Sequence, residues 1–245
     1  ALSCGKKETI KVAAAGYPME EIVKIAAEDL KKEGYDTKIT LLTDYVTANV
    51  GLANKDFDAN FHQHVPFMEI FNKKNNAHLV KVAAIYDVYV GFYSKKYKSK
   101  NEIPNGAKVV VPNDPSNRGR ALILLEKQGL IKLKNSNDLL STVADIVENP
   151  KNLKISEVDT SVAARALDDV DLAVVNNTYA GQVGLNAQDN GVFVEDKDSP
   201  YVNIIVARTD NKDSKAIQDF VKAYQTEEVY QEAKKHFKDG VVKGW

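Results

Sequence analysis

The segment VVVPNDPSNRGRALILL, residues 109–125, joins a strand to a helix through a tight polar turn. Three consecutive valines are typical of a strand that is buried on both faces. Pro112 to Pro115 cannot continue that strand, and the apolar residues from Ala121 favour a helix. Asp114 is the expected N-cap, with Pro115 in the first helical position. Such a junction aims backbone N–H groups at one spot, which suits an anion.

Two polar side chains project from the same face of this predicted helix. Arg120 follows Asn117 by three residues, a spacing that places both on the same side. An arginine can hold a carboxylate through two parallel hydrogen bonds. The segment therefore predicts a seat for a carboxylate, although a surface ion pair would explain Arg120 equally well.

Strand and helix patterns alternate along the chain, once before Ser94 and again after it. Strands are expected over 10–15, 37–42, 57–61, 79–94 (one long or two consecutive), 109–111, 153–157, 172–175, 192–194 and 201–207. Helices are expected over 19–32, 45–54, 66–74, 115–128, 137–147, 162–167, 215–224 and 227–237. This alternation predicts an α/β architecture with mainly parallel sheets. The length of 245 residues fits two α/β lobes with a cleft between them.

Parallel sheets bind ligands outside the carboxyl ends of their strands, so the residues after each predicted strand are candidates for a site. The first half of the chain places aromatic and imidazole groups there, and the second half places amides and an arginine. Taken singly, each ring could be core and each asparagine a turn residue. Taken together they suit a small zwitterion with an apolar or thioether side chain. The candidates are Tyr17, Tyr45, His62, His64, Phe67, Asn113, Asn117, Arg120 and Asn176.

Composition excludes several classes of protein. The net charge of −1, from 33 basic and 34 acidic residues, gives no basic excess for nucleic acid. No apolar run approaches the roughly 18–20 residues of a membrane-spanning helix. The sequence has no nucleophile elbow, phosphate loop or dinucleotide fingerprint. We therefore expect a binding protein rather than an enzyme, and no cofactor.

His62 and His64 support a second hypothesis, a metal-binding receptor. Alternate residues of a strand point the same way, so the two imidazoles could be two metal ligands. A third ligand would have to come from another part of the chain, and the sequence places none nearby. The available donors are His78, His236, Asp44 and Glu69.

The only cysteine, Cys4, excludes a disulfide within the chain. Residues 1–5, ALSCG, are similar to the end of a bacterial lipoprotein signal, where cleavage exposes a cysteine that is then lipidated. Ala1 departs from this pattern, because such signals usually have leucine there. Cys4 is therefore the expected lipid anchor, with residues 1–8 as a flexible tether. A leftover cysteine in a frayed terminus is the alternative.

Five motifs resemble the NlpA/MetQ family of methionine-binding lipoproteins, and the resemblance covers essentially the whole chain. Residues 112–120 are its most specific part. The motifs are Asp58-Ala59-Asn60 with Gln63-His64-x-Pro66, Val111 to Arg120, Val174 to Ala180, Ser199 to Asn203, and Val242-Lys243-Gly244-Trp245.

The resemblance implies a periplasmic-binding-protein-like fold. Two α/β lobes would be joined by two crossover strands, with the ligand in the interlobe cleft. Lobe I would comprise residues 9–88 plus 203–245, and lobe II residues 89–202. The implied function is that of a substrate-binding lipoprotein that captures methionine and delivers it, by lobe closure, to an ABC importer. L-methionine is the first choice, and D-methionine or a methionine derivative or dipeptide stays open.

The resemblance also implies partners and a location. The partners would be the permease and ATPase complex of the importer and a membrane, reached through the lipid on Cys4. A monomer is expected in the bacterial cell envelope, with its folded part periplasmic or extracellular. A surface adhesin with a vestigial pocket is a further alternative.

The resemblance assigns roles to seven residues. Arg120 would hold the ligand carboxylate, and Asn117 and Asn176 would contact the polar end. The thioether pocket would be lined by Tyr45, His62, His64 and Phe67. This chain departs from the family pattern, which has phenylalanine in place of His62 and tyrosine in place of Phe67. Phe61 comes one position early and would point to the other face of a strand. The side-chain preference of the pocket therefore stays open.

Overall fold

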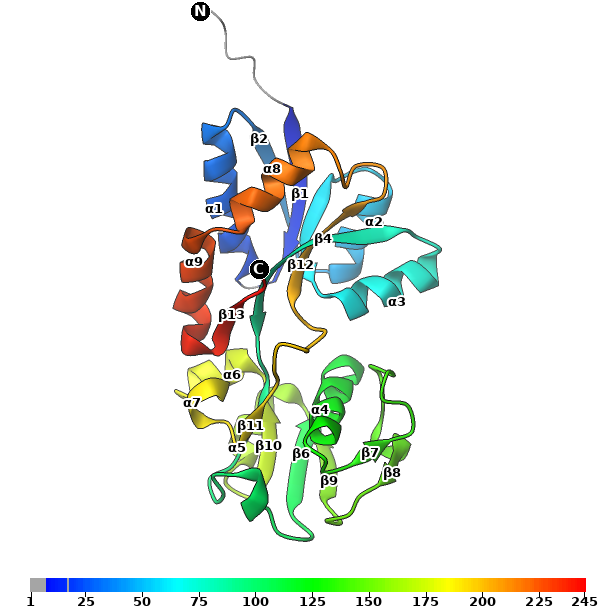
Figure 1. Ribbon diagram of the computed structural model, residues 1–245, viewed down its shortest axis with the longest axis vertical. Helices are drawn as coiled ribbons and strands as arrows, with labels where there is room; N and C mark the ends of the chain where they lie inside the picture. Colours follow the sequence, from blue (N-terminus) through cyan, green and yellow to red (C-terminus); the bar gives the residue numbers. More distant parts are fainter. Residues whose placement is uncertain (1–7, 17) are drawn as a thin grey trace, which may run out of the picture. The chain divides into compact units, whose positions relative to one another are not determined.

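A computed structural model describes residues 8–16 and 18–245, without the side chains of Thr178, Gln182 and Asp239 (Figure 1). Cys4, the tether residues 1–7 and Tyr17 lie outside the described residues. The chain divides into two compact units: unit 1 runs to Asp87 and resumes at Pro200–Trp245, and unit 2 is Val88–Ser199. Within the described part of the chain, none of the helices combines the length and apolarity that a membrane span requires.

Unit 1 is built on a six-stranded sheet with the strand order β13-β4-β12-β3-β1-β2. Its elements are β1 Thr9–Ala15, α1 Met19–Lys32, β2 Asp36–Leu42, α2 Tyr45–Ala53, β3 Ala59–Gln63, α3 Val65–Asn75, β4 Leu79–Val88, β12 Asn203–Arg208, α8 Lys215–Tyr224, α9 Glu227–Phe237, η4 Lys238–Gly240 and β13 Val241–Lys243. Helices α1, α8 and α9 pack together on one side of this sheet, and α2 and α3 lie on the other (Figure 1).

Unit 2 is built on a five-stranded sheet with the order β11-β5-β10-β6-β9, and β7 and β8 form a separate pair. Its elements are β5 Gly91–Tyr93, η1 Lys100–Glu102, β6 Lys108–Pro112, α4 Pro115–Lys127, β7 Lys132–Leu133, η2 Val143–Asp145, β8 Ile146–Glu148, β9 Lys154–Val158, η3 Thr160–Val162, α5 Ala163–Ala166, β10 Leu172–Val175, α6 Asn177–Gln182, α7 Ala187–Asn190 and β11 Phe193–Val194.

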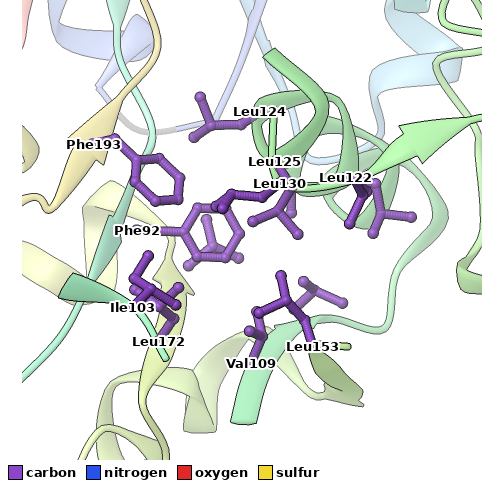
Figure 2. Close-up of a cluster of buried hydrophobic side chains, with 14 of the residues drawn as sticks. Phe92, Ile103, Val109, Leu122, Leu124, Leu125, Leu130, Leu153, Leu172 and Phe193 are labelled. Atoms are coloured by element: carbon purple, nitrogen blue, oxygen red, sulfur yellow. The ribbon is translucent and has the colours of Figure 1, made fainter. Parts of the chain in front are cut away.

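The valine run of β6 is buried on both faces, as predicted. Val109 and Val111 belong to the cluster beneath α4, together with Leu122 and Leu125 (Figure 2). Val110 points the other way, into a second cluster that α5, α6 and α7 cover. Because helices cover both faces of the sheet, this strand needs no polar alternate positions.

The α/β class is confirmed, but the expectation of mainly parallel sheets is wrong. Strands β2 and β3 pair parallel with β1, and β9 and β10 pair parallel with β6. The strands nearest the unit boundaries pair antiparallel, β12 with β3 and β4, and β5 with β10 and β11. The physical reason in unit 1 is that β4 leaves the unit and β12 returns to it, so the two run in opposite directions.

The helix expected over 137–147 is also wrong. The backbone N–H of Thr142 donates to Asp145 Oδ2 at 2.7 Å, which closes a single turn, η2. The chain then extends into β8, which pairs with β7.

Candidate functional site

Three rings from three elements of unit 1 meet at one place. Tyr45 is the first residue of α2, His62 lies in β3, and Phe67 lies in the first turn of α3. The Tyr45 and His62 rings stack with centroids 5.4 Å apart. Phe67 meets both edge-on, at 6.1 Å from Tyr45 and 5.9 Å from His62. We call Tyr45, His62 and Phe67 the ring cluster. It runs from the interior, where His62 is 5% exposed, to the surface, where Tyr45 is 44% exposed.

Two helix caps hold the outer rings. The Asp44 carboxylate accepts from the Thr47 hydroxyl and the Val46 backbone N–H, and these bonds lower the pKa of Asp44. It caps α2 just before Tyr45. His64 Nδ1 accepts from the backbone N–H of Phe67 at 3.3 Å and caps α3. Each cap starts its helix at a point that sets the ring in place.

His64 thus contributes a cap, and its ring meets Tyr201 rather than the ring cluster, with centroids 5.0 Å apart. Phe61 points to the opposite face of β3, as predicted. It is fully buried against Tyr86 and Tyr224, with ring centroids 6.0 and 5.2 Å away. The rings of Tyr45, His62 and Phe67, three of the four predicted pocket residues, therefore lie together. The fourth, His64, contacts Phe67 only through its hydrogen bond to the Phe67 backbone N–H.

A buried amide cluster, Asn49, Asn60 and Gln63, lies beneath the ring cluster. Asn49 Oδ1 accepts from Asn60 Nδ2 and Gln63 Nε2, both at 2.8 Å, and Asn49 Nδ2 donates to Gln63 Oε1 at 3.0 Å. His62 Nε2 lies 3.3 Å from the same Asn49 oxygen. Sequence reasoning missed this cluster. The sequence signal was the group of polar residues Asn60, His62 and Gln63 at the end of an expected strand, and the structure buries all three.

Burial dominates the ionisation of His62. Desolvation disfavours the imidazolium and lowers the pKa of His62 from 6.5 to about 4. His62 is therefore neutral at physiological pH. Its Nδ1 atom is buried and has no hydrogen-bond partner among the residues that the structure describes.

In unit 2, helix α4 begins as predicted. Asp114 is the N-cap and Pro115 the first helical residue. Asp114 Oδ2 accepts from the backbone N–H of Asn117 at 3.0 Å, and Oδ1 accepts from the Thr160 hydroxyl at 2.9 Å. The backbone N–H of Asn117, one of the groups expected to bind an anion, is therefore already bonded to Asp114. Binding of an anion at this helix start would rely more on side chains.

Arg120 forms a two-bond ion pair with Glu195. Nε donates to Glu195 Oε2 at 2.9 Å and Nη2 donates to Oε1 at 2.5 Å, while Nη2 also donates to the Val88 carbonyl at 3.2 Å. Glu195 Oε1 further accepts from the Val90 backbone N–H at 2.8 Å. Arg120 does hold a carboxylate through two hydrogen bonds, as predicted, but this carboxylate is the side chain of Glu195. Sequence reasoning missed this partner. A ligand carboxylate would have to share the Arg120 guanidinium with Glu195.

Asn176 follows β10, and its carbonyl accepts the Ala180 backbone N–H at 2.9 Å at the start of α6. The next residue, Asn177, donates through Nδ2 to the carbonyls of Val88 and Tyr89 at 3.2 and 3.1 Å. The Val88 carbonyl therefore receives Arg120 from α4 and Asn177 from α6. This shared acceptor brings Arg120 together with Asn177, a residue that the sequence analysis did not select.

The metal-receptor hypothesis gains no third ligand. Among residues 8–16 and 18–245, no group of three or more His, Cys, Asp or Glu side chains is arranged to hold a metal ion. His62 and His64 face different partners, the Asn49 amide and Tyr201.

Comparisons with known proteins give one consistent family. The NlpA lipoprotein family model matches residues 10–245. The probable D-methionine-binding lipoprotein MetQ of Haemophilus influenzae is 67% identical over 238 residues, which are 96% of this chain and 87% of that protein.

Solved structures give the same picture. A YaeC-family lipoprotein from Enterococcus faecalis is 37% identical, with a TM-score of 0.88 over 98% of this chain and all of that one. A nutrient-binding protein from Burkholderia cenocepacia, bound to methionine, is 42% identical, with a TM-score of 0.76 over 96% of this chain and all of that one.

Proposed function

We propose, on the premise that this chain belongs to the NlpA lipoprotein family, that it captures methionine and delivers it to an ABC importer. Its fold is the periplasmic-binding-protein-like fold of its relatives. The observation that carries the proposal is the methionine-bound relative, at 42% identity along nearly the whole chain. The ring cluster and the Arg120–Glu195 pair are the features of this chain that support it.

We assign the amino-acid end of the ligand to unit 2. Arg120 would hold the carboxylate, and Asn117 and Asn176 would contact the polar end. A charged guanidinium strengthens a hydrogen bond to a carboxylate to roughly twice that of a neutral pair. Glu195 neutralises part of this charge, and it also fixes the guanidinium in place before the ligand arrives.

We assign the thioether to unit 1. Tyr45, His62 and Phe67 offer ring faces and edges, and a sulfur–aromatic contact contributes about 0.3–1.5 kcal/mol. His64 would support this wall through its cap on the Phe67 backbone. No bond is made or broken, so delivery depends on conformation. The ligand favours a lobe-closed state only as far as it binds that state more tightly.

Thermal unfolding tests the proposal. The protein is unfolded, freed of ligand, refolded and heated with L-methionine, D-methionine, methionine sulfoxide or a methionine dipeptide. A ligand at a hundred times its Kd adds about 2.7 kcal/mol of stability. The proposal fails if no compound of this series raises the unfolding temperature. Alanine, which has no thioether, is the control for unspecific effects.

The location and partners of the chain are also proposed. We infer that Cys4 carries the lipid that its family name implies, that the folded part is a monomer outside the cytoplasm, and that the importer is a permease and ATPase complex. The Cys4→Ser variant should move from the membrane fraction to the soluble fraction of the producing bacterium. Its retention in the membrane fraction would contradict the anchor.

A further inference from the structure

Strand β9 forms an open edge of the sheet in unit 2. It is the last strand of that sheet, and within the described residues it pairs with β6 alone (Figure 1). The Lys154 backbone N–H donates to the Ala107 carbonyl, just before β6, at 2.8 Å. Successive residues of a strand direct their backbone groups to opposite sides. Ile155 and Glu157 therefore direct their N–H and carbonyl groups away from β6, toward the free edge.

A side-chain amide already occupies one position of this edge. Asn149 Oδ1 accepts the Leu153 backbone N–H at 2.9 Å, and Asn149 Nδ2 donates to the Leu153 carbonyl at 3.0 Å. An amide side chain has the donor and acceptor of a peptide group, so Asn149 pairs with Leu153 as a residue of an added strand would. Ile155 and Glu157 follow on the same edge, and no such partner pairs with them among the described residues. Their backbone groups can bond one more strand.

A groove of about 680 Å³ lies at this edge, within the range of about 300–1,000 Å³ that ligand pockets occupy. Its lining differs between the two faces of the sheet. Lys108 and Lys154 are paired residues of β6 and β9, so their side chains lie on the same face. Ile155 points to the other face, where it and Ile146 pack against the apolar cluster beneath α4.

The lysine face of the groove suits an anion. Lys108 and Lys154 are exposed, and like charges paired across two strands repel each other. Neither lysine forms an ion pair with another described residue. The Asp171 carboxylate accepts the Lys108 backbone N–H at 2.7 Å, but it is shared with the Lys96 ammonium at 3.2 Å.

We propose that an extended segment of a partner protein, with acidic and apolar side chains in alternation, adds to unit 2 as a strand beside β9. The Ile155 and Glu157 backbone groups would bond its main chain, as in other peptides that add to a sheet edge. Because side chains of a strand alternate between faces, its acidic residues would meet Lys108 and Lys154. Its apolar residues would meet Ile155. The lysines begin β6 and β9, whereas Arg120 lies on α4, which follows the opposite end of β6.

Peptide titration and hydrogen exchange test the proposal. The probe is a dye-labelled, capped peptide of alternating glutamate and valine, and its control has lysine in place of glutamate. Fluorescence anisotropy should show saturable binding of the acidic peptide only. With that peptide at ten times its Kd, NMR should show exchange of the Ile155 and Glu157 amide hydrogens slowed about tenfold. The Lys154 amide, already bonded to Ala107, should change little.

Variants of the groove test each contact separately. Lys108→Glu combined with Lys154→Glu should raise the Kd of the acidic peptide about tenfold or more, because two ion pairs become repulsive. Lys132→Glu changes an exposed lysine of β7 in the same unit and should leave the Kd unchanged.

A proline variant tests the backbone contact and decides the matter if the double variant does not fold. Ile155→Pro removes an outward N–H, which an edge strand tolerates, and Ile155→Ala removes the same side chain but keeps the N–H. The Kd should be about fivefold higher in the proline variant than in the alanine variant, the effect of one hydrogen bond.

Four results would overturn the proposal. The acidic peptide does not bind at millimolar concentration, or it binds without slowing exchange of the Ile155 and Glu157 amides. The lysine peptide binds as tightly as the acidic one, or the double variant binds the acidic peptide as the wild type does. A dimer in sedimentation that Ile155→Pro abolishes would instead place a second copy of this chain at the edge and would also contradict a partner peptide.

Discussion

Glu195 determines how Arg120 can act on a ligand. Two hydrogen bonds to a carboxylate that is 8% exposed, and a third to the Val88 carbonyl, fix the plane of the guanidinium. An arginine side chain carries about 2 kcal/mol of rotamer entropy. Because the ion pair orders Arg120 when the protein folds, ligand binding does not bear that cost again. Such pre-organisation raises affinity.

Arg120→Lys tests whether the pre-organised guanidinium of Arg120 binds the ligand carboxylate. Lysine keeps the charge and can still pair with Glu195, but it lacks the planar fork. We expect the Kd of methionine to rise by about tenfold or more, equal to roughly 1.4 kcal/mol. Calorimetric titration gives the Kd, and a denaturant melt checks that the variant is folded.

Arg118→Lys is the matched control, because Arg118 lies on the same helix and pairs with Glu157 at 2.7 Å. It should bind methionine as the wild type does. Equal affinities in the wild type and Arg120→Lys would remove the carboxylate role from Arg120.

His62 gives a prediction for acid pH. The unfolded chain protonates this histidine near pH 6.5, and the folded chain does so only near pH 4. The unfolded state therefore binds more protons inside this window, and stability falls as the pH drops through it. The loss amounts to about 3 kcal/mol. Urea unfolding at intervals from pH 7 to pH 4 should show wild-type stability falling by this amount relative to His62→Phe. Parallel curves for the two proteins would show that His62 titrates normally.

Strand-end reasoning selected Tyr45, Phe67 and Arg120 as candidates, because those positions follow from local patterns in the sequence. It could not find Glu195, which lies 75 residues from Arg120. That pairing depends on β11 and β5 being neighbours in the sheet, and no local pattern specifies sheet order. Asn49 was missed for a related reason. It lies in a helix whose residues are apolar nearly all round, so its burial became evident only from the fold.

At the scale of elements, α4 depends on one glycine. A Cβ atom added at Gly119 would lie 2.0 Å from the carbonyl oxygen of Leu139. The loop that contains Leu139 therefore packs directly on the helix backbone. This contact explains why a residue that costs helix stability stands in the interior of α4.

Gly119→Ala should destabilise the protein, although a glycine-to-alanine change inside a helix ordinarily stabilises it by roughly 0.5–1 kcal/mol. Overpacking against a backbone atom costs about 1–3 kcal/mol and reverses the sign. Urea unfolding measures the change. Gly181→Ala is the control, because nothing lies within 4 Å of its added Cβ. A gain of stability in Gly119→Ala would show that the 139 loop moves freely.

Local sequence patterns predicted a helix correctly where an apolar helix face or an N-cap residue specifies it. Helices α8 and α9 have their predicted limits, and Ser214 and Thr226 cap them. The prediction failed where a few residues depend on a distant partner. The segment 137–147 turns through a side-chain bond of Asp145, and β13 was missed because it is three residues long and pairs within the sheet of unit 1.

At the scale of the whole molecule, both units bury tyrosines whose hydroxyls have no partner among the described residues. Tyr86 and Tyr224 belong to unit 1 and Tyr93 to unit 2. Burial raises the pKa of Tyr93 to about 12 and raises the pKa of the other two as well. A raised pKa in the folded state means that stability is fully present below pH 10 and is lost as the pH rises.

Alkaline titration followed by tyrosinate absorbance should therefore show two phases. A free phenol ionises near pH 10. Tyr86, Tyr93 and Tyr224 should ionise only as the protein unfolds, together with the loss of its circular dichroism. Tyr35, which is also buried and has its pKa raised to about 12, should ionise with them. A single smooth phase below the unfolding pH would contradict their burial.

The α/β class followed from the sequence, but the direction of the strands did not. Direction depends on where the chain re-enters a sheet, and unit 1 is completed by residues that follow all of unit 2. Only a signal linking residues near 60 and 80 to those near 205 could have revealed this.

The position of β12 has a consequence for biosynthesis. This strand lies between β3 and β4, yet it follows β3 by about 140 residues, which a ribosome at 5–20 residues per second takes on the order of ten seconds to add. Throughout that interval β3 and β4 have been synthesised, but β12, the strand that lies between them in the sheet, has not. We expect this to be the period in which a chaperone or secretion factor must shield the newborn chain, whereas unit 2, encoded without interruption, can be finished first.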